Sequence, residues 1–235
     1  MDYSKLLNPT VVKIKPSGIR KFFDIAAEME DVISLGVGEP DFQTPWHIRQ
    51  AGIKSLQDGK TKYTSNWGLS ELRRAVCDYM REQVGVSYDP EHEILISVGG
   101  SEAIDAAVRA IVGYGDEVLI VEPSFVCYEP IVRLAGGVPV IIPTKAENQF
   151  RLTAEELKSR ITERTKLLIL PYPGNPTGAI MERSDLEAIA EVLKNTDIAV
   201  VSDEIYSELT YTGNKHVSIA SVGDMAERTV IINGF

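Results

Sequence analysis

Six short apolar runs, all after about residue 90, constrain the fold of this chain more than any other feature. None of them alternates polar and apolar residues, as a strand with one exposed face would, so each is predicted to be a strand that is covered on both faces. Turn or breaker residues bracket every run. The runs are EILISV (93–98), EVLIVE (117–122), VPVIIP (138–143), KLLILP (166–171), IAVVSD (198–203) and TVIING (229–234).

Helix-like stretches lie between several of these runs, with the sequences SEAIDAAVRAIVG, FVCYEPIVRLAGG, TAEELKSRI and ERSDLEAIAEVLK. In the last two, Thr153 and Ser184 precede acidic residues and are the predicted N-caps. This alternation of strands and helices predicts an α/β fold with a mainly parallel sheet. The first 90 residues differ: TPWHIRQAGIKSLQDG and LSELRRAVCDYMREQVG are predicted helices that flank the sheet, and residues 1–40 are expected to form an arm or part of a second domain.

The charge balance narrows the function classes. The chain has 235 residues with 24 Lys and Arg against 34 Asp and Glu, a net charge of −10. A general role on nucleic acid or on a membrane surface is disfavoured, because both need a basic face. The apolar runs are far shorter than the roughly 20 residues of a membrane span. The N-terminal sequence MDYSKLLNPT lacks the layout of a signal peptide, so a cytoplasmic protein is expected.

The cysteines and histidines indicate no special chemistry. Cys77 and Cys127 form no CxxC pair and are interpreted as two reduced thiols of a cytoplasmic protein. His47, His92 and His216 are scattered without the spacing of metal ligands, so no metal site is predicted.

In open α/β sheets, ligands bind beyond the carboxyl ends of the strands, where the strand order switches. The segment SVGGSEAID runs from a predicted strand through two glycines into a helix, and the free amides of that helix N-terminus would suit a phosphate. The alternative is a tight connection without a ligand. The stretch PYPGNPTG, rich in proline and glycine, would hold Asn175 rigidly. Phe125, just past another run, either packs in the core or stacks on a flat heterocycle.

The last polar cluster follows the run 198–203. Asp203 and Glu204 should point to opposite faces, because successive strand residues alternate. They are either capping or surface residues, or Asp203 bonds a protonated ring nitrogen while Tyr206 donates to a ring oxygen. A ligand with a phosphate, a flat ring, a basic ring nitrogen and a phenolic oxygen would satisfy all these sites. Pyridoxal 5′-phosphate has all four groups, and an aspartate is the usual partner of its ring nitrogen.

The chain also resembles the class I and II pyridoxal-phosphate-dependent aminotransferases of fold type I, and most closely the bacterial aspartate and aromatic aminotransferases. The resemblance spans residues 34–235 and implies an α/β/α three-layer large domain, incomplete over residues 41–235, with an arm or part of the small domain in residues 1–40. Its C-terminal small domain would be missing. The matching stretches are SLGVGEPDFQTP, KYTSNWGLSELR, GGSEAID, GDEVLIVEPSFVCYEP, LPYPGNPTGAI, SDEIYSELTY and TVIINGF.

The resemblance implies roles for individual residues. Cofactor contacts are expected from the backbone of Gly100, Ser101 and Glu102 to the phosphate, from Phe125 to the ring face, from Asn175 and Tyr206 to the ring 3′-oxygen, and from Asp203 to the ring nitrogen. Tyr63 would reach the phosphate of the neighbouring subunit, which implies a homodimer. Gly38, with Asn175, would line the substrate site, and the Asn175–Pro176 peptide bond is expected to be cis.

The family places Ser-Lys directly after a stretch like INGF, and this lysine holds the cofactor as a Schiff base. The chain ends at Phe235, so the lysine is expected just beyond it and no catalytic residue is assigned within the chain. The chain as given is therefore expected to be inactive. The lysines with the sequence numbers 60, 62, 145, 158 and 166 are expected at the surface.

The complete protein is expected to transfer an amino group between an L-amino acid and a 2-oxo acid in amino acid metabolism. A pyridoxal-phosphate-dependent carbon–sulfur β-lyase on the same scaffold is the alternative within enzymes. A non-catalytic cofactor-binding domain of a transcription regulator is another alternative, although the N-terminal segment is too short for a DNA-binding module. The remaining alternative is an inactive fragment. The sequence encoded after Phe235 would separate these possibilities best.

Overall fold

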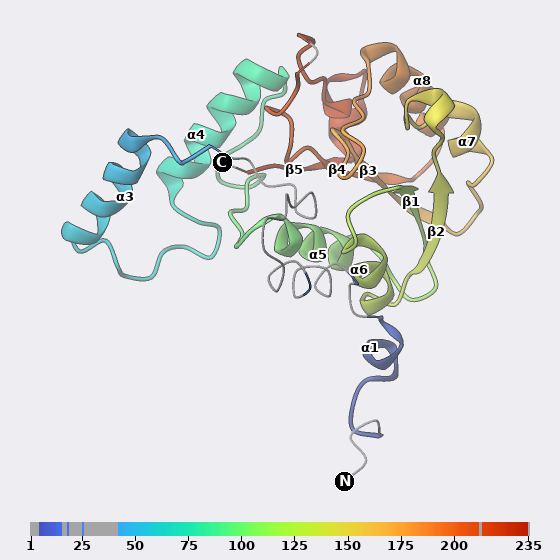
Figure 1. The fold of residues 1–235 in the computed structure, drawn as a ribbon, viewed down its shortest axis with the longest axis horizontal. Coiled ribbons are helices and arrows are strands. Elements are labelled where there is room, and N and C mark those ends of the chain that lie inside the picture. Colours follow the sequence, from blue (N-terminus) through green and yellow to red (C-terminus); the bar gives the residue numbers. More distant parts are fainter. Residues whose placement is uncertain (1–4, 16–17, 19–24, 26–41, 212, 235) are drawn as a thin grey trace.

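The structure is a computed structural model that describes residues 5–15, 18, 25, 42–211 and 213–234 (Figure 1). Most of the predicted arm, residues 1–40, lies outside the described residues, so the division into two domains stays a prediction. The described part of the arm contains the short helix α1 (Pro9–Lys13), which begins where the Asn8 side chain accepts a hydrogen bond of 2.8 Å from the Thr10 amide.

The centre of the fold is a five-stranded sheet in the order β2-β1-β3-β4-β5. Every neighbouring pair is parallel, which confirms the predicted parallel α/β fold. The strands are β1 (Glu117–Glu122), β2 (Val138–Pro143), β3 (Thr165–Pro171), β4 (Ala199–Asp203) and β5 (Thr229–Ile232).

Helices flank the sheet and connect its strands. The α-helices are α3 (Trp46–Gln57), α4 (Ser70–Tyr79), α5 (Gly100–Ile111), α6 (Tyr128–Leu134), α7 (Ala154–Lys158) and α8 (Arg183–Leu193). A π-helix, η2 (Met80–Val84), continues α4. Within residues 42–211 and 213–234 there are also the short 3-10 helices η3 (Ala146–Asn148), η4 (Ile219–Ser221) and η5 (Met225–Arg228).

Two apolar clusters, one on each face of the sheet, make the fold a three-layer α/β/α arrangement. One cluster joins α5 and α6 to the sheet and includes Ile104, Val108 and Val132. The other joins α7, α8, η4 and η5 to the opposite face and includes Leu157 and Ile189. Burying one such side chain completely stabilises the fold by about 1.5–3 kcal/mol. The continuous apolar runs of β1, β3 and β4 are therefore explained by helices on both sides.

The edge strands correct the prediction that every run is covered on both faces. In β2 only Ile142 is buried, and Val138 is 41% exposed. In β5, Val230 is 41% exposed. A central strand has a hydrogen-bonded neighbour on each side and lies under the helices, whereas these two strands have one neighbour each. A similar apolar composition therefore serves two different environments.

The run 93–98 was predicted to be a strand, and this prediction is wrong. These residues have no strand structure; the Ile96 amide donates to the Trp67 carbonyl at 3.1 Å instead. Leu95 is 54% and Val98 is 91% exposed. A strand needs a neighbour for its backbone groups, and nothing in the described part of the chain pairs with this run in a sheet.

The predicted helix starts are right at one helix and wrong at another. Thr153 caps α7, where it and Glu156 form a reciprocal capping box. At α8, however, the cap is Glu182 and not Ser184, because the Glu182 side chain accepts from the backbone of Asp185 and the Asp185 side chain accepts from the Glu182 amide. The helix consequently begins before Ser184, which lies inside its first turn.

The two predicted N-terminal helices are confirmed as α3 and α4, and they differ in packing. Helix α3 buries none of its residues and lies away from the sheet in Figure 1. Helix α4 buries Arg73 and Cys77. Neither Cys77 nor Cys127 forms a disulfide. Among the described residues, no helix combines the length and the apolar character that crossing a membrane requires.

Candidate functional site

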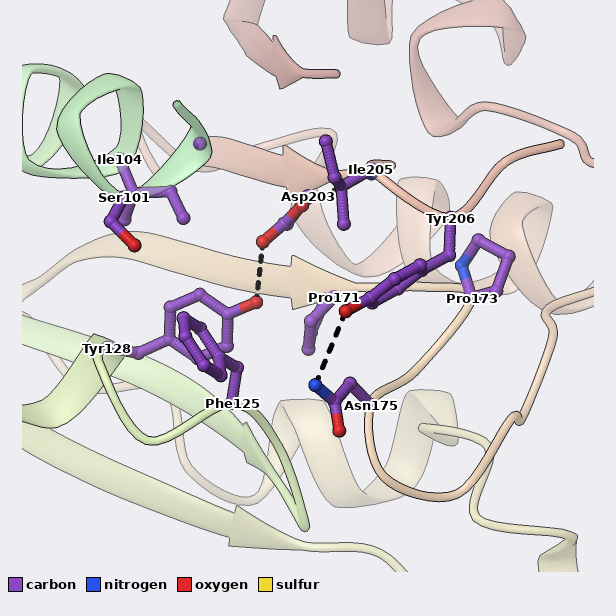
Figure 2. A pocket seen from close by; sticks show the side chains of 11 residues that line it. Ser101, Ile104, Phe125, Tyr128, Pro171, Pro173, Asn175, Asp203, Ile205 and Tyr206 are labelled. Carbon is purple, nitrogen blue, oxygen red and sulfur yellow. Dashed lines mark hydrogen bonds between the residues drawn. The ribbon is translucent and has the colours of Figure 1, made fainter. Parts of the chain in front are cut away.

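A pocket of about 160 Å³ opens at the carboxyl ends of the central strands (Figure 2). The chain passes from β1 outward to β2 and then returns to the other side of β1 to form β3, so the strand order switches between β1 and β3. This is the place where open α/β sheets bind ligands. The lining residues are Gly100, Ser101, Ile104, Phe125, Tyr128, Pro171, Pro173, Asn175, Asp203, Ile205 and Tyr206.

Asp203, the last residue of β4, presents a buried carboxylate to this pocket; it is 6% exposed. One carboxylate oxygen accepts a hydrogen bond of 2.7 Å from the Tyr128 hydroxyl, and the other accepts from the Ile205 amide at 3.2 Å. Burial raises the pKa of Asp203, while these two donors oppose that rise. None of the described residues that line the pocket is a Lys, Arg or His. The carboxylate is thus suited to a cationic group of a ligand.

Glu204 faces the opposite way, as strand alternation predicts. It is fully buried and does not line the pocket. Its carboxylate accepts hydrogen bonds from the hydroxyls of Ser202 and Ser218, at 2.8 and 2.6 Å, and contacts His216 at 2.8 Å. The prediction that Asp203 faces the cleft while Glu204 faces away is confirmed.

Asn175 and Tyr206 lie together on one wall of the pocket (Figure 2), and the Asn175 amide donates to the Tyr206 hydroxyl at 3.4 Å. Backbone hydrogen bonds within the loop that carries Asn175 fix its conformation. The Gly174 amide donates to the Ala179 carbonyl at 2.9 Å, and the Gly178 amide donates to the Gly174 carbonyl at 2.7 Å. The Asn175–Pro176 peptide bond is cis, as predicted. The structure thus places an amide and a phenol where both can reach one ligand atom.

The start of α5 forms another wall. Gly99 has φ 85°, a left-handed conformation that glycine adopts without strain, and Gly100 and Ser101 line the pocket. The amides in the first turn of a helix have no partner within the helix and favour an anion. Glu102 is not a lining residue; its side chain accepts from the Val98 amide. Because residues 93–98 are not a strand, the predicted strand-to-helix turn is a loop-to-helix turn.

Phe125 and Tyr128 form the aromatic wall of the pocket. Their ring centroids are 6.1 Å apart at an interplanar angle of 83°, an edge-to-face contact. Phe125 is 40% exposed, so its ring remains accessible, whereas Tyr128 is only 2% exposed. Burial and the Asp203 carboxylate raise the pKa of the Tyr128 hydroxyl, which therefore stays protonated as a donor. Sequence reasoning missed Tyr128; the available signal was its place three residues after Phe125, in the same stretch that was predicted to be a helix.

Besides Glu102, Tyr63 is a predicted site residue that does not line this pocket, and it is fully exposed. Gly38 lies outside the residues that the structure describes. The five lysines that were expected at the surface are all exposed: Lys60, Lys62, Lys145, Lys158 and Lys166. The pocket therefore unites Gly100, Ser101, Phe125, Asn175, Asp203 and Tyr206 from the predicted set.

Comparison with known proteins identifies relatives over nearly the whole chain. The family model of aminotransferase class I and II matches residues 30–235. The aspartate aminotransferase of Pyrococcus abyssi is 49% identical over 222 residues, which cover 94% of this chain and 57% of that protein. Aromatic-amino-acid aminotransferase 2 of Thermococcus litoralis is 44% identical over 229 residues, which cover 97% of this chain and 59% of that protein.

Solved structures show the same similarity. The aspartate aminotransferase of Thermus thermophilus with maleate superposes with a TM-score of 0.91 at 39% identity, over 97% of this chain and 60% of that chain. The chain thus spans about three fifths of the length of the proteins that it matches.

Proposed function

The chain belongs to the class I and II aminotransferase family, and on this premise we propose that the complete protein transfers an amino group from an L-amino acid to a 2-oxo acid with pyridoxal 5′-phosphate. The observation that carries the proposal is the buried Asp203 carboxylate, which faces a pocket whose described lining offers it no cationic side chain. Burial of a charge is costly unless a partner compensates it, and a protonated ring nitrogen would be that partner.

The residues of the pocket fit this cofactor by chemistry. The first turn of α5 offers amides to a phosphate, and Phe125 offers an accessible ring face. Asn175 and Tyr206 offer an amide and a hydroxyl that already lie within 3.4 Å of each other. Bound pyridoxal 5′-phosphate supplies an electron-accepting ring for the chemistry at the substrate α-carbon.

The chain's own residues then have distinct tasks. Asp203 would keep the ring nitrogen protonated, and the Tyr128 hydroxyl would hold the carboxylate in the required direction. The α5 amides would fix one end of the ligand, and Phe125 would fix the tilt of the ring. Ile104, Pro171, Pro173 and Ile205 supply apolar surface that limits water in the pocket.

Several further parts of the proposal rest on the family relationship. We propose that residues 41–235 are the incomplete large domain, that residues 1–40 belong to an arm or to the small domain, and that the lysine that binds the cofactor follows Phe235. Tyr63, fully exposed here, would contact the phosphate in the partner of a cytoplasmic homodimer. The backbone of Glu102 would assist at the phosphate, and Gly38 and Asn175 would contact the substrate.

The test is an amino-transfer assay on the complete protein. Purified protein is loaded with pyridoxal 5′-phosphate, and the 2-oxo acid formed from aspartate, aromatic and other L-amino acids is measured with 2-oxoglutarate as acceptor. Cofactor-dependent transfer supports the proposal. Elimination of thiol from cysteine conjugates without any amino transfer would favour a β-lyase instead and would contradict it.

A further inference from the structure

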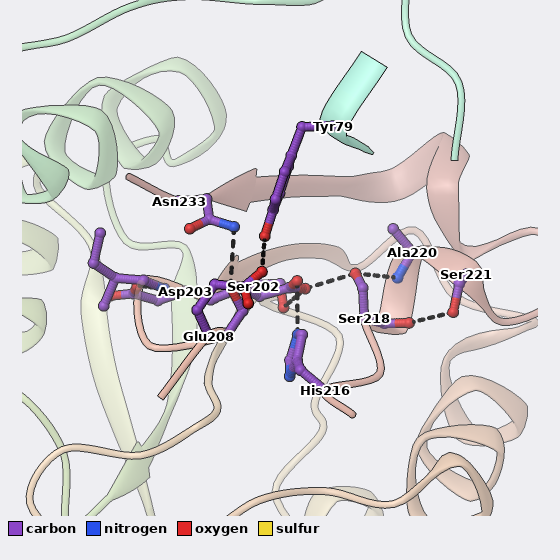
Figure 3. A network of polar contacts seen from close by, with 12 residues as sticks. Tyr79, Ser202, Asp203, Glu208, His216, Ser218, Ala220, Ser221 and Asn233 are labelled. Atoms are coloured by element: carbon purple, nitrogen blue, oxygen red, sulfur yellow. Dashed lines mark hydrogen bonds and ion pairs between the residues drawn. The ribbon is translucent and has the colours of Figure 1, made fainter. Parts of the chain in front are cut away.

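A buried polar cluster surrounds Glu204, outside the pocket and on the opposite side of the β4 end from Asp203 (Figure 3). One carboxylate oxygen of Glu204 accepts from Ser202 and Ser218, and the other lies 2.8 Å from His216 Nε2. The Glu204 amide donates to the Ile232 carbonyl at 2.8 Å. A single residue thereby joins the ends of β4 and β5 to the segment that leads into η4.

The partners of Glu204 are themselves fixed in place. Ser218 is the N-cap of η4, and its hydroxyl accepts from the Ala220 amide at 3.2 Å. The Ser221 hydroxyl donates to the Ser218 carbonyl at 2.8 Å. Glu204 is thus attached to a short capped helix and to a strand, which are both part of the folded core, since Ile219 and Ile232 are 1% and 3% exposed.

The turn that follows Glu204 carries two pocket residues, Ile205 and Tyr206. The Ser207 amide donates to the Glu204 carbonyl at 2.9 Å, which closes the turn. Outside the pocket lining, Asn233 donates to the Ser207 hydroxyl at 3.3 Å (Figure 3). On the pocket side, the side chain of Tyr206 has one described hydrogen bond, from Asn175 at 3.4 Å. The turn is therefore held largely by residues that do not line the pocket.

A buried carboxylate adds little net stability, because the cost of its desolvation offsets much of the stabilisation that its hydrogen-bond partners provide. Directional hydrogen bonds from several segments do fix a geometry, as the supporting residues of a binding site must. We propose that Glu204 is a positioning residue: through Ser202, Ser218 and His216 it holds the β4 end and the following turn so that Asp203 and Tyr206 face the pocket. This inference rests on the proposed function, because the ligand that Asp203 and Tyr206 would contact is the proposed cofactor.

A matched control exists at the amino end of another strand of the sheet. Glu117 begins β1, is 4% exposed, accepts from the Thr162 hydroxyl and pairs with Arg164. It is a buried, hydrogen-bonded glutamate of the same sheet, but it lies at the amino end of its strand and outside the pocket lining. Glu117→Leu therefore controls for the general cost of removing a buried carboxylate.

The experiment compares Glu204→Leu, Glu204→Gln and Glu117→Leu in the complete protein by two measurements. The first is hydrogen exchange of the amides in residues 203–209, and the second is the affinity for pyridoxamine 5′-phosphate, which needs no lysine to bind. Glu204→Leu should speed exchange in this segment at least about tenfold and weaken affinity by about 10- to 100-fold. Glu204→Gln, which keeps the shape and an acceptor, should stay within about threefold of wild type in affinity. Glu117→Leu should leave both unchanged.

Wild-type exchange in residues 203–209 of Glu204→Leu would overturn the inference whether or not the ligand binds. Equal loss of affinity in Glu117→Leu would overturn it as well, because the effect would then be general destabilisation. If Glu204→Leu does not fold, His216→Leu keeps the carboxylate, removes one partner and is judged by the same two measurements. A wild-type protein that does not bind pyridoxamine 5′-phosphate would count against the proposed function, and the exchange result would still decide the role of Glu204.

Discussion

Asp203 and Glu204 are adjacent, buried carboxylates on opposite sides of one strand end, and their surroundings differ. Glu204 has side-chain partners from three residues and no access to the pocket. Asp203 has one side-chain partner, Tyr128, and one backbone donor, and it lines the pocket. A carboxylate that is held by several side chains within the core supports the fold, whereas one that has fewer partners and lines a pocket retains capacity for a ligand. This difference supports the two proposed roles, which are structural for Glu204 and ligand-binding for Asp203.

The largest expected effect is the loss of stability when the Glu204 carboxylate is removed. Glu204→Ala leaves the buried hydroxyls of Ser202 and Ser218 without their acceptor, so the free energy of unfolding should fall by about 3–5 kcal/mol. Urea denaturation followed by circular dichroism measures it. Asp203→Ala, the control, removes a poorly compensated charge and should destabilise far less. Equal losses in the two variants would remove the distinction between the two carboxylates.

The next largest effect tests the proposed ligand-binding role of Asp203. In the complete protein, Asp203→Ala should lower kcat/KM for amino transfer by about 10²- to 10³-fold, because the ring nitrogen loses its anionic partner. Steady-state kinetics with saturating cofactor measures the change. Asp105→Ala, which removes a partly exposed carboxylate paired with Arg109 on α5, serves as the control and should retain activity. Turnover of Asp203→Ala near that of the control would disprove the proposed role of Asp203.

A smaller effect tests how Asp203 is held. Tyr128→Phe removes the hydroxyl that donates to the carboxylate at 2.7 Å. The free energy of unfolding at neutral pH should fall by about 1–3 kcal/mol, since a hydrogen bond to a charged group is lost. The same substitution in an Asp203→Leu background should cost less, and the double-mutant cycle from denaturant titrations gives the coupling. Additive effects would show that the contact between the two side chains contributes nothing.

The smallest effect is a pH dependence. Burial raises the pKa of Asp203 above the ordinary value of 3.8, so the folded chain binds more protons than the unfolded chain between those two pKa values. The contribution of Asp203 to stability is therefore most favourable below pH 3.8 and falls as pH rises through the raised value. Asp203→Asn should remove this part of the slope, which denaturant titrations of ligand-free protein over a pH series would detect. An unchanged slope would contradict the assigned pKa direction.

The features that follow from local periodicity were predictable. Central strands such as β3 and β4 are continuous apolar runs because helices cover both faces, and the opposite directions of Asp203 and Glu204 follow from the two-residue period of a strand. The pocket position follows in the same way, since polar residues that end parallel strands meet at one edge of the sheet. Asn175, Asp203 and Tyr206 could therefore be grouped without knowledge of any contact.

The features that depend on distant partners were not predictable. Residues 93–98 have a strand-like composition, but a strand also needs a neighbour, and composition does not reveal whether one is present. The contact of Tyr128 with Asp203 joins residues 75 positions apart. To predict this contact, one must know how α6 is oriented relative to β4, and local sequence patterns do not reveal that. The N-cap of α8 was predicted wrongly for a different reason. Glutamate rarely caps helices, and Glu182 does so here through a capping box with Asp185.

The most direct test of the central claim, that Asp203 is reserved for a cationic ring nitrogen, is a binding cycle with two ligands and two proteins. The affinities of pyridoxamine 5′-phosphate and of its analogue with carbon in place of the ring nitrogen are measured by calorimetry for the wild-type protein and for Asp203→Asn. The wild-type protein should prefer the nitrogen ligand by about 10- to 100-fold, as expected for a charge-assisted hydrogen bond, and Asp203→Asn should lose most of this preference. The same preference in both proteins would contradict the claim.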